Sequence, residues 1–315
     1  MAGANLPSKK YKKTAPTQLR LSFEGTGGST QFIDIAQALS IINKRFYRQG
    51  VYYYVNSVEF YNNADHYMDL HVCPDTWGVK NAWNRGFKIF QKMNALAPSG
   101  FRPKYHDFKI YMSARHATTG TMEPSMYDIN AAATPFSADE WVYSRYTSMD
   151  DNHDGSPDAD EFTAHMLGGH TEQDGTGSST RMDSIGLLTS YQQSRARQPD
   201  AQPNLPSGAT GDPLANLFDA SSEEFINDLV ENLEADNDET PYNNDLSVGQ
   251  NGHMQHVARL ATSTSLGRVA TAPGFCAPFG LICVDPANTT APTDEWRLTI
   301  NLAPGTYHGV YAERA

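Results

Sequence analysis

The chain of 315 residues is 39% hydrophobic and 19% charged, so it can bury a sizeable core and lacks the composition of a disordered protein. No apolar run approaches the roughly 18 residues that a membrane span needs. We expect no secretion signal, because no apolar segment follows the positive charge at the start. The cysteines Cys73, Cys276 and Cys283 lack zinc spacing and cannot all pair, which indicates reduced thiols in a protein made inside a cell.

Charge is distributed unevenly along the chain. Residues 1–120 hold 16 Lys+Arg against 7 Asp+Glu, a net of +9, whereas residues 121–245 hold 4 against 25, a net of −21. Such asymmetry indicates two faces in different surroundings, one suited to a polyanion and the other to solvent. A solvated acidic surface would account for the middle segment alone but not for the basic beginning.

The first sixteen residues form a basic arm in this interpretation. Lys9, Lys10, Lys12 and Lys13 lie among Gly, Pro and Ser residues, and Arg20 follows without an intervening acid. One interpretation is a solubilising tail. The other is a tether that binds nucleic-acid phosphates without reading sequence, with these four lysines and Arg20 as the contact residues.

Alternating and β-branched segments predict strands along most of the remaining chain. Those in the first 200 residues are 17–23, 51–61, 66–72, 107–113, 140–148 and 182–193; the later ones are 256–263, 280–285, 296–302 and 306–313. A turn-like sequence separates 51–61 from 66–72, so we expect these two strands to form a hairpin.

Apolar residues at helical spacing predict three short helices. Their stripes are Ile35, Leu39, Ile42 and Phe46 in the first, Val79, Trp83, Phe87 and Phe90 in the second, and Phe225, Leu229 and Leu233 in the third. We expect Gly50 to end the first helix, Thr76 to cap the second, and Ser221 with Glu224 to cap the third.

Counting about eight or nine of these ten candidate segments as strands, with short helices in the connections, favours an all-β fold, an antiparallel β-sandwich of the jelly-roll kind, over a parallel βαβ sheet. The predicted organisation is the basic arm over residues 1–16 and one jelly-roll domain over 17–315. That domain would carry an acidic insertion at about 116–250.

The stretch "MDDNHDGSPDADEF" (149–162) matches a calcium-binding loop. Such a loop supplies oxygen ligands from its positions 1, 3, 5, 7, 9 and 12 and has glycine at position 6. These ligand positions are filled by Asp150, Asn152, Asp154, Ser156 (through its carbonyl), Asp158 and Glu161. Gly155 takes position 6; the stretch before the loop, 140–148, is strand-like, and only the short apolar stretch "FTAHML" (162–167) follows, which is wrong for a helix–loop–helix hand. We therefore predict a structural Ca²⁺ that pins a long connection; an acidic turn that only resembles such a loop is the alternative.

Catalytic patterns are weak. The segment "GTGGST" (25–30) lacks the third glycine of a dinucleotide fingerprint and the Lys-Ser/Thr pair of a phosphate loop, so a flexible turn is favoured. His165 and His170 do not have zinc-protease spacing, and we expect them to decorate a loop. We expect no enzyme.

Four phrases in a fixed order resemble the capsid proteins of small tailless icosahedral single-stranded DNA viruses. They are "NKRFYRQG" (43–50) before a tyrosine-rich strand, "DTWGVKNAWNRGF" (75–87), "PGFCAPFGL" (273–281) and "APGTYHGVYAE" (303–313). The resemblance covers about the first 115 and the last 60 residues and leaves the acidic middle without a counterpart.

The resemblance implies a jelly-roll subunit that self-assembles into an icosahedral shell around a DNA genome. The protein would then be part of the virion and would assemble inside the host cell. Its partners would be copies of itself, genomic DNA bound by the arm, and minor capsid proteins, with membrane contact left open. The acidic insertion would point outward, and the calcium loop would stiffen it or an interface.

The alternative is a calcium-dependent carbohydrate-binding β-sandwich, in which Trp141 and Tyr143 would stack on sugars. The lysine arm has no role in that class. An enzyme on a β-sandwich scaffold is a third interpretation, for which the sequence offers no recognisable catalytic set.

Overall fold

A computed structural model of the chain describes most of the residues outside the N-terminus and the acidic middle. The described residues are 16–62, 65–97, 104–127, 133–135, 140–148, 160–172, 182–194, 253–263, 267–286 and 295–314. They form mostly antiparallel β-sheets with a few helices, in agreement with the all-β sandwich expected from the sequence.

Eight strands pair in a nested, antiparallel manner, the first with the last and so on inward. The four pairs are β1 (Arg20–Thr26) with β15 (Glu295–Leu302), β2 (Gln31–Asp34) with β14 (Leu281–Asp285), β3 (Val51–Asn62) with β13 (Val269–Ala277), and β4 (His66–Val72) with β12 (Gln255–Thr262). Two more pairings, β15 with β3 and β14 with β4, join these pairs into two sheets.

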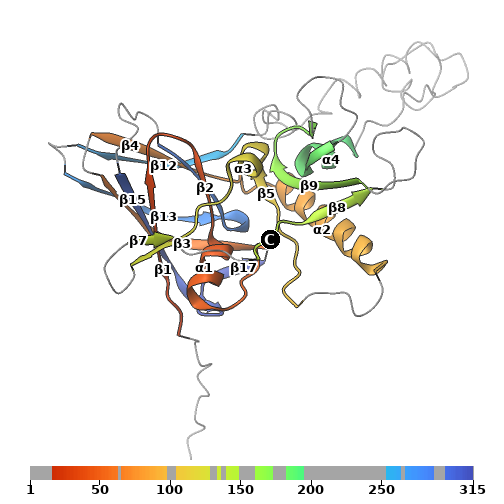
Figure 1. Ribbon diagram of the computed structural model, residues 1–315, viewed down its shortest axis with the longest axis horizontal. Coiled ribbons are helices and arrows are strands. Elements are labelled where there is room, and N and C mark those ends of the chain that lie inside the picture. Colours follow the sequence, from red (N-terminus) through yellow and green to blue (C-terminus); the bar gives the residue numbers. More distant parts are fainter. Residues whose placement is uncertain are drawn as a thin grey trace, which may run out of the picture.

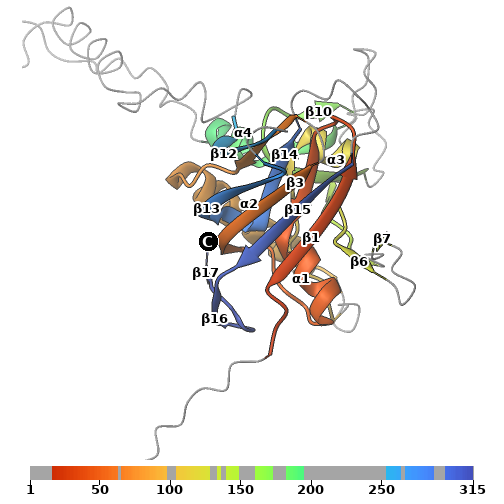
Figure 2. The same ribbon diagram turned by 90° about the vertical axis from the view of Figure 1, so that its left-hand side faces the viewer.

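Sheet 1 has the strand order β1-β15-β3-β13, and sheet 2 has the order β12-β4-β14-β2. Figure 2 shows the four strands of sheet 1 side by side, and Figure 1 shows the two sheets facing each other. After β15 the chain forms β16 (Pro304–Tyr307) and turns back as β17 (Ala312–Arg314), which pairs with the beginning of β3.

The first core lies between these two sheets, because alternate residues of each strand point inward. Phe23, Val58 and Ile300 of sheet 1 meet Leu70 and Ile282 of sheet 2 in one buried cluster. The helix α1 (Ile35–Asn43) packs on the same cluster and begins at the cap Asp34, whose carboxylate accepts from two backbone N–H groups.

A second core covers the β2 and β14 part of the other face of sheet 2. In β14, Ile282 and Val284 belong to the first core, whereas Leu281 and Cys283 belong to the second. The strand is therefore buried on both faces, which explains why "LICV" is apolar throughout. Across this second core lie α2 (Trp77–Ala95) and α4 (Leu187–Gln193), which approach closely at Gly86.

Most of the elements that build the second core come from the long connection between β4 and β12. This connection carries the mixed sheet 3, of order β10-β11-β9-β5 with β8 paired to β9, and a small β6–β7 hairpin. The elements other than α2 and α4 are β5 (Tyr111–Ser113), α3 (Ala114–Thr119), β6 (Ser125–Tyr127), β7 (Ala133–Pro135), β8 (Arg145–Ser148), β9 (Asp160–Leu167), β10 (Thr171–Glu172) and β11 (Met182–Gly186).

Several predicted elements are confirmed. Strands occur at 51–62, 66–72, 255–262, 281–285 and 295–302, and Thr76 caps α2 by accepting from the Val79 N–H. The predicted hairpin of 51–61 with 66–72 is wrong, because β3 and β4 lie in different sheets and pair with different partners. Both strands place apolar residues in the first core, so they face each other across it.

Two other expectations need correction, and one strand was not expected. The first helix ends at Asn43 and not near Gly50, because Lys44 takes a left-handed conformation with φ 52°. The segment 182–193 is a strand only to Gly186 and then becomes α4. The strand β13 was not predicted, because Pro273 argues against a strand; its place at the edge of sheet 1 tolerates the missing N–H.

Candidate functional site

Five of the six predicted calcium ligands, Asp150, Asn152, Asp154, Ser156 and Asp158, lie outside the described residues. The sixth, Glu161, lies in β9. The strands β8 and β9 on either side of this segment pair with each other, with Ser148 opposite Asp160. The loop candidate therefore joins two strands of a hairpin and not two helices, as the flanking sequence indicated.

Glu161 forms an ion pair with Arg145, which lies diagonally across the hairpin because Thr147 is the residue opposite Glu161, at 2.9 Å between Nη1 and Oε2. Both side chains are more than half exposed, so the pair adds less than about 1 kcal/mol to stability. The carboxylate is thus reachable from solvent. Within the described ranges, no group of three or more His, Cys, Asp or Glu side chains is placed to hold a metal ion.

Of the predicted nucleic-acid contacts, Lys9, Lys10, Lys12 and Lys13 also lie outside the described residues. Arg20 begins β1, and its guanidinium lies 3.0 Å from the Glu59 carboxylate on the outer face of sheet 1. Arg297 and Glu24 form a second pair between neighbouring strands of that sheet. The charge of Arg20 is therefore partly neutralised by the Glu59 carboxylate.

The point where the arm joins the fold is held by three hydrogen bonds. The Gln18 N–H donates to the Asn43 side chain at 2.7 Å, and the Asn43 amide donates back to the Gln18 carbonyl at 3.2 Å. The Thr17 hydroxyl donates to the His308 carbonyl at 2.7 Å. These bonds fix the root of the arm, residues 16–18, between the end of α1 and the turn before β17.

A basic segment adjoins this root. Lys44, Arg45 and Arg48 follow α1 and are exposed. Sequence reasoning assigned residues 43–50 to a helix and to the capsid resemblance and missed them as a charged surface. The signal was three cations in five residues, in the same part of the chain as the basic arm.

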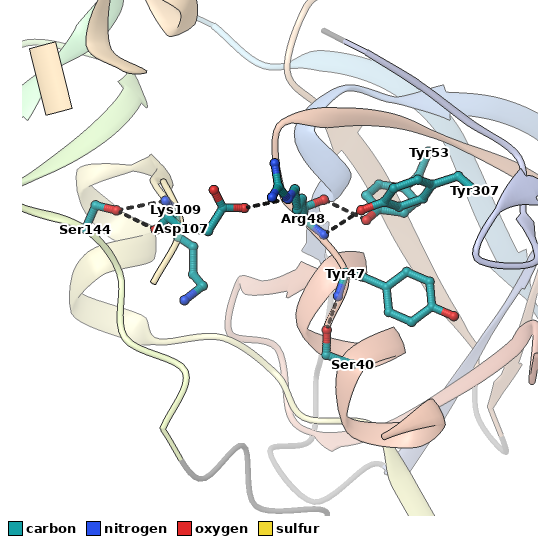
Figure 3. A network of polar contacts seen from close by, with 8 residues as sticks. All are labelled: Ser40, Tyr47, Arg48, Tyr53, Asp107, Lys109, Ser144 and Tyr307. Carbon is teal, nitrogen blue, oxygen red and sulfur yellow. Dashed lines mark hydrogen bonds and ion pairs between the residues drawn. The ribbon is translucent and has the colours of Figure 1, made fainter. Parts of the chain in front are cut away.

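Figure 3 shows how the chain holds the segment between α1 and β3. Tyr53 donates its hydroxyl hydrogen to the Arg48 carbonyl at 2.7 Å, and the Arg48 N–H donates to the Tyr307 hydroxyl at 3.0 Å. Burial raises the pKa of both tyrosines, so their hydroxyls stay protonated. The Arg48 guanidinium reaches Asp107 at 3.7 Å and so ties the segment to the long connection.

A buried polar bridge lies behind this segment. The Gln49 side chain both accepts from the Ile110 N–H at 2.6 Å and donates to its carbonyl at 2.9 Å. The same amide donates to the Asp34 carboxylate at 3.1 Å. Burial raises the pKa of Asp34 to about 6, although the hydrogen bonds that its carboxylate accepts from Gln37, Gln49 and Ala36 and the charge of Lys109 oppose the shift.

The acidic stretch attaches at the opposite end of the molecule. Figures 1 and 2 both place α4 and the start of β12 at the top and α1 with the start of β1 at the bottom. The chain between α4 and β12, residues 195–252, holds 12 Asp+Glu against 2 Arg, a net of −10. The attachment points of the acidic stretch and of the basic arm are therefore well separated.

Two other side chains that the sequence singled out, Tyr143 and His165, are buried inside the fold. Tyr143 is 9% exposed and stacks on Tyr111 with ring centroids 4.0 Å apart, so its face is not open to a sugar. His165 is buried in β9 and not in a loop, which corrects that expectation. It is 2.8 Å from the Ser184 hydroxyl, and burial lowers the pKa of its imidazole to about 4.

Comparisons with known protein families, with curated proteins and with solved structures find no match to this chain. In the part of the chain that the structure describes, no helix combines the length and the apolar character that crossing a membrane requires.

Proposed function

We propose that this protein is a structural subunit that assembles with copies of itself into a closed icosahedral shell around a DNA genome. Its sandwich would then be a jelly roll, in which a long antiparallel hairpin is rolled into two four-stranded sheets. The proposal includes the virion as its location, assembly inside the host cell, and no enzymatic activity.

The nested pairing of the eight sandwich strands carries the proposal. Counted in chain order, they form the orders 1-8-3-6 and 2-7-4-5, since β17 only extends sheet 1. The chain-order numbers of the two strands in each nested pair sum to nine, as a rolled hairpin requires. Sheet 1 contains the pairs 1 with 8 and 3 with 6, and sheet 2 contains the pairs 2 with 7 and 4 with 5. This arrangement supports a jelly roll, an architecture that viral capsid domains share with lectins and cupins.

The separation of charge supports the enclosure of DNA in particular. The root of the basic arm and the exposed cations at 44–48 lie at the α1 end, and the acidic 195–252 stretch attaches at the α4 end. In a shell, the α1 end would face the genome, where Lys9, Lys10, Lys12 and Lys13 neutralise phosphates. The acidic end would face outward, and Ca²⁺ at 150–161 would stabilise the connection that carries it.

The assembly state tests this proposal. Purified full-length protein should form closed particles in negative-stain electron microscopy and sediment as a large species, favoured by Ca²⁺ and by moderate salt that screens the acidic stretches. Monomers or dimers under every combination of these conditions would contradict the shell proposal. Calcium-dependent retention on a glycan array by such monomers would favour the carbohydrate-binding sandwich.

A further inference from the structure

The basic segment 44–48 and two segments that are far from it in the sequence bring aromatic and basic side chains together. The aromatic–basic cluster consists of Phe46, Lys104, Tyr105, Lys109 and Trp141. Neither the calcium loop nor the lysine arm includes these residues, and sequence reasoning did not combine them.

The three rings form a continuous aromatic row. Phe46 lies in the middle, with its ring centroid 5.8 Å from that of Tyr105 and 6.1 Å from that of Trp141. Both neighbours are tilted relative to Phe46, by 50° and 46°, so the rings meet partly by their edges.

Two ammonium groups lie over this row. Lys104 Nζ is 5.3 Å from the centroid of the Tyr105 ring, and Lys109 Nζ is 4.6 Å from that of Trp141 and 5.6 Å from that of Phe46. Figure 3 shows the Lys109 side chain extending away from the hydrogen bonds that hold its backbone to Ser144. The lysine is thus fixed at its base, with its charge beside the rings.

Exposure separates this cluster from an ordinary structural cation–π contact. Packing accounts for Trp141, which is partly buried against the first core, and for Lys109 above it. It does not account for Tyr105, which leaves 60% of its surface in water, or for the adjoining Val142 at 53%. Lys104 beside it is exposed as well, and an exposed ring next to an exposed cation has the chemistry that stacks on a nucleobase while the cation meets a phosphate. Lys109 is only 5% exposed and donates to the Val142 carbonyl, so it supports Trp141 from within.

We propose that the aromatic–basic cluster is a stacking site for the bases of single-stranded nucleic acid. The inference deepens the proposed function and rests on it, because the cluster lies beside the root of the basic arm. Phe46 is three residues from Asn43, which binds the root, so their Cα atoms are at most about 11 Å apart. A strand held by the arm can therefore reach the rings.

Fluorescence anisotropy with a labelled 20-nucleotide oligo-dT tests the site in the full chain. Lys9, Lys10, Lys12 and Lys13 are first changed to Ala, so that binding by the arm does not mask the cluster. In this background Tyr105→Ala should weaken single-strand binding about 5- to 150-fold, the value of one stacked base. Tyr105→Phe should restore it, and Tyr61→Ala, an exposed tyrosine at the far end of β3, is the matched control.

Two further readings distinguish stacking from charge. Tyr105→Ala should leave binding to a duplex of equal length unchanged and should leave the salt slope unchanged, because no phosphate contact is lost. Lys104→Ala should instead reduce the slope by about 0.7, the value for one phosphate contact on a single strand.

Equal single-strand affinities of the Tyr105→Ala and Tyr61→Ala variants would overturn the stacking site, as would an absence of single-strand binding in the arm-substituted background. Glycan binding that Tyr105→Ala abolishes, without DNA binding, would overturn it in favour of a sugar. Particle formation by the same variants is scored separately by microscopy. Particles without a Tyr105 effect refute only the stacking site, and a Tyr105 effect without particles refutes only the shell.

Discussion

The carboxylate of Asp34 makes the stability of the sandwich depend on pH in a defined direction. This side chain is fully buried and caps α1, and burial raises its pKa from 3.8 to about 6. The folded protein therefore holds the proton more tightly than the unfolded chain does. The resulting stabilisation is complete below about pH 4 and is lost as the pH rises through about 6.

The magnitude follows from the difference of about 2 pKa units. At 1.36 kcal/mol per unit, burying the ionised carboxylate costs about 3 kcal/mol of unfolding free energy relative to the protonated form. Asp34→Asn removes the titration. Its amide oxygen can still accept from the Ala36 and Gln37 N–H groups, but its NH₂ cannot accept from Gln49, a loss that does not depend on pH.

Urea unfolding followed by tryptophan fluorescence should be measured for both proteins from pH 4 to 7.5. The stability of wild type relative to Asp34→Asn should fall by about 2 to 3 kcal/mol over this range. Ile41→Val, a change in the same helix that carries no titratable group, should give a constant offset of about 1 kcal/mol. A pH-independent difference between wild type and Asp34→Asn would refute the reasoning.

Three further predictions concern other parts of the chain. Calorimetric titration should show weaker Ca²⁺ binding by Glu161→Gln but not by Arg145→Gln, which removes the ion pair and keeps the ligand; equal binding by all forms, or none, would refute the site. Changing the four lysines within 9–13 to Ala should reduce the salt slope of single-strand DNA binding by about 3, and an unchanged slope would make the arm a solubilising tail. Gly25→Ala should cost about 1 to 3 kcal/mol in urea unfolding, because its Cβ would overlap the Trp296 indole; an unchanged midpoint would show that the indole can move freely.

Strand positions could be predicted from the sequence better than strand partners. The period-two pattern of "HYMDLHV" depends on one buried face and is local, so β4 was found within its true bounds. Partner choice is not local: Ser22 meets Thr299, 277 residues away, and no feature of either segment specifies that pairing. The hairpin expected from the short turn after β3 failed for this reason.

The two candidate sites also differ in whether their residues are close together in the sequence. The calcium loop could be predicted because all of its candidate ligands fall within twelve consecutive residues, and such spacing is visible in a sequence. The aromatic–basic cluster was missed because Phe46, Tyr105 and Trp141 come from three separate segments. Gln49 gave no signal either, since its role depends on the backbone of Ile110 in the long connection.

The two sandwich sheets also differ in what they leave available to neighbouring subunits. The second core covers the β2 and β14 part of the outer face of sheet 2, and ion pairs such as Arg20 with Glu59 lie on the outer face of sheet 1. Large exposed apolar residues occur elsewhere, at Val269 on the edge strand β13 and at Leu96 just after α2. A stable contact buries at least about 1,000 Å² with an apolar centre. In the proposed shell, the β13 edge and the end of α2 therefore have the chemistry for contacts between subunits, and the outer face of sheet 1 is left for solvent or polar partners.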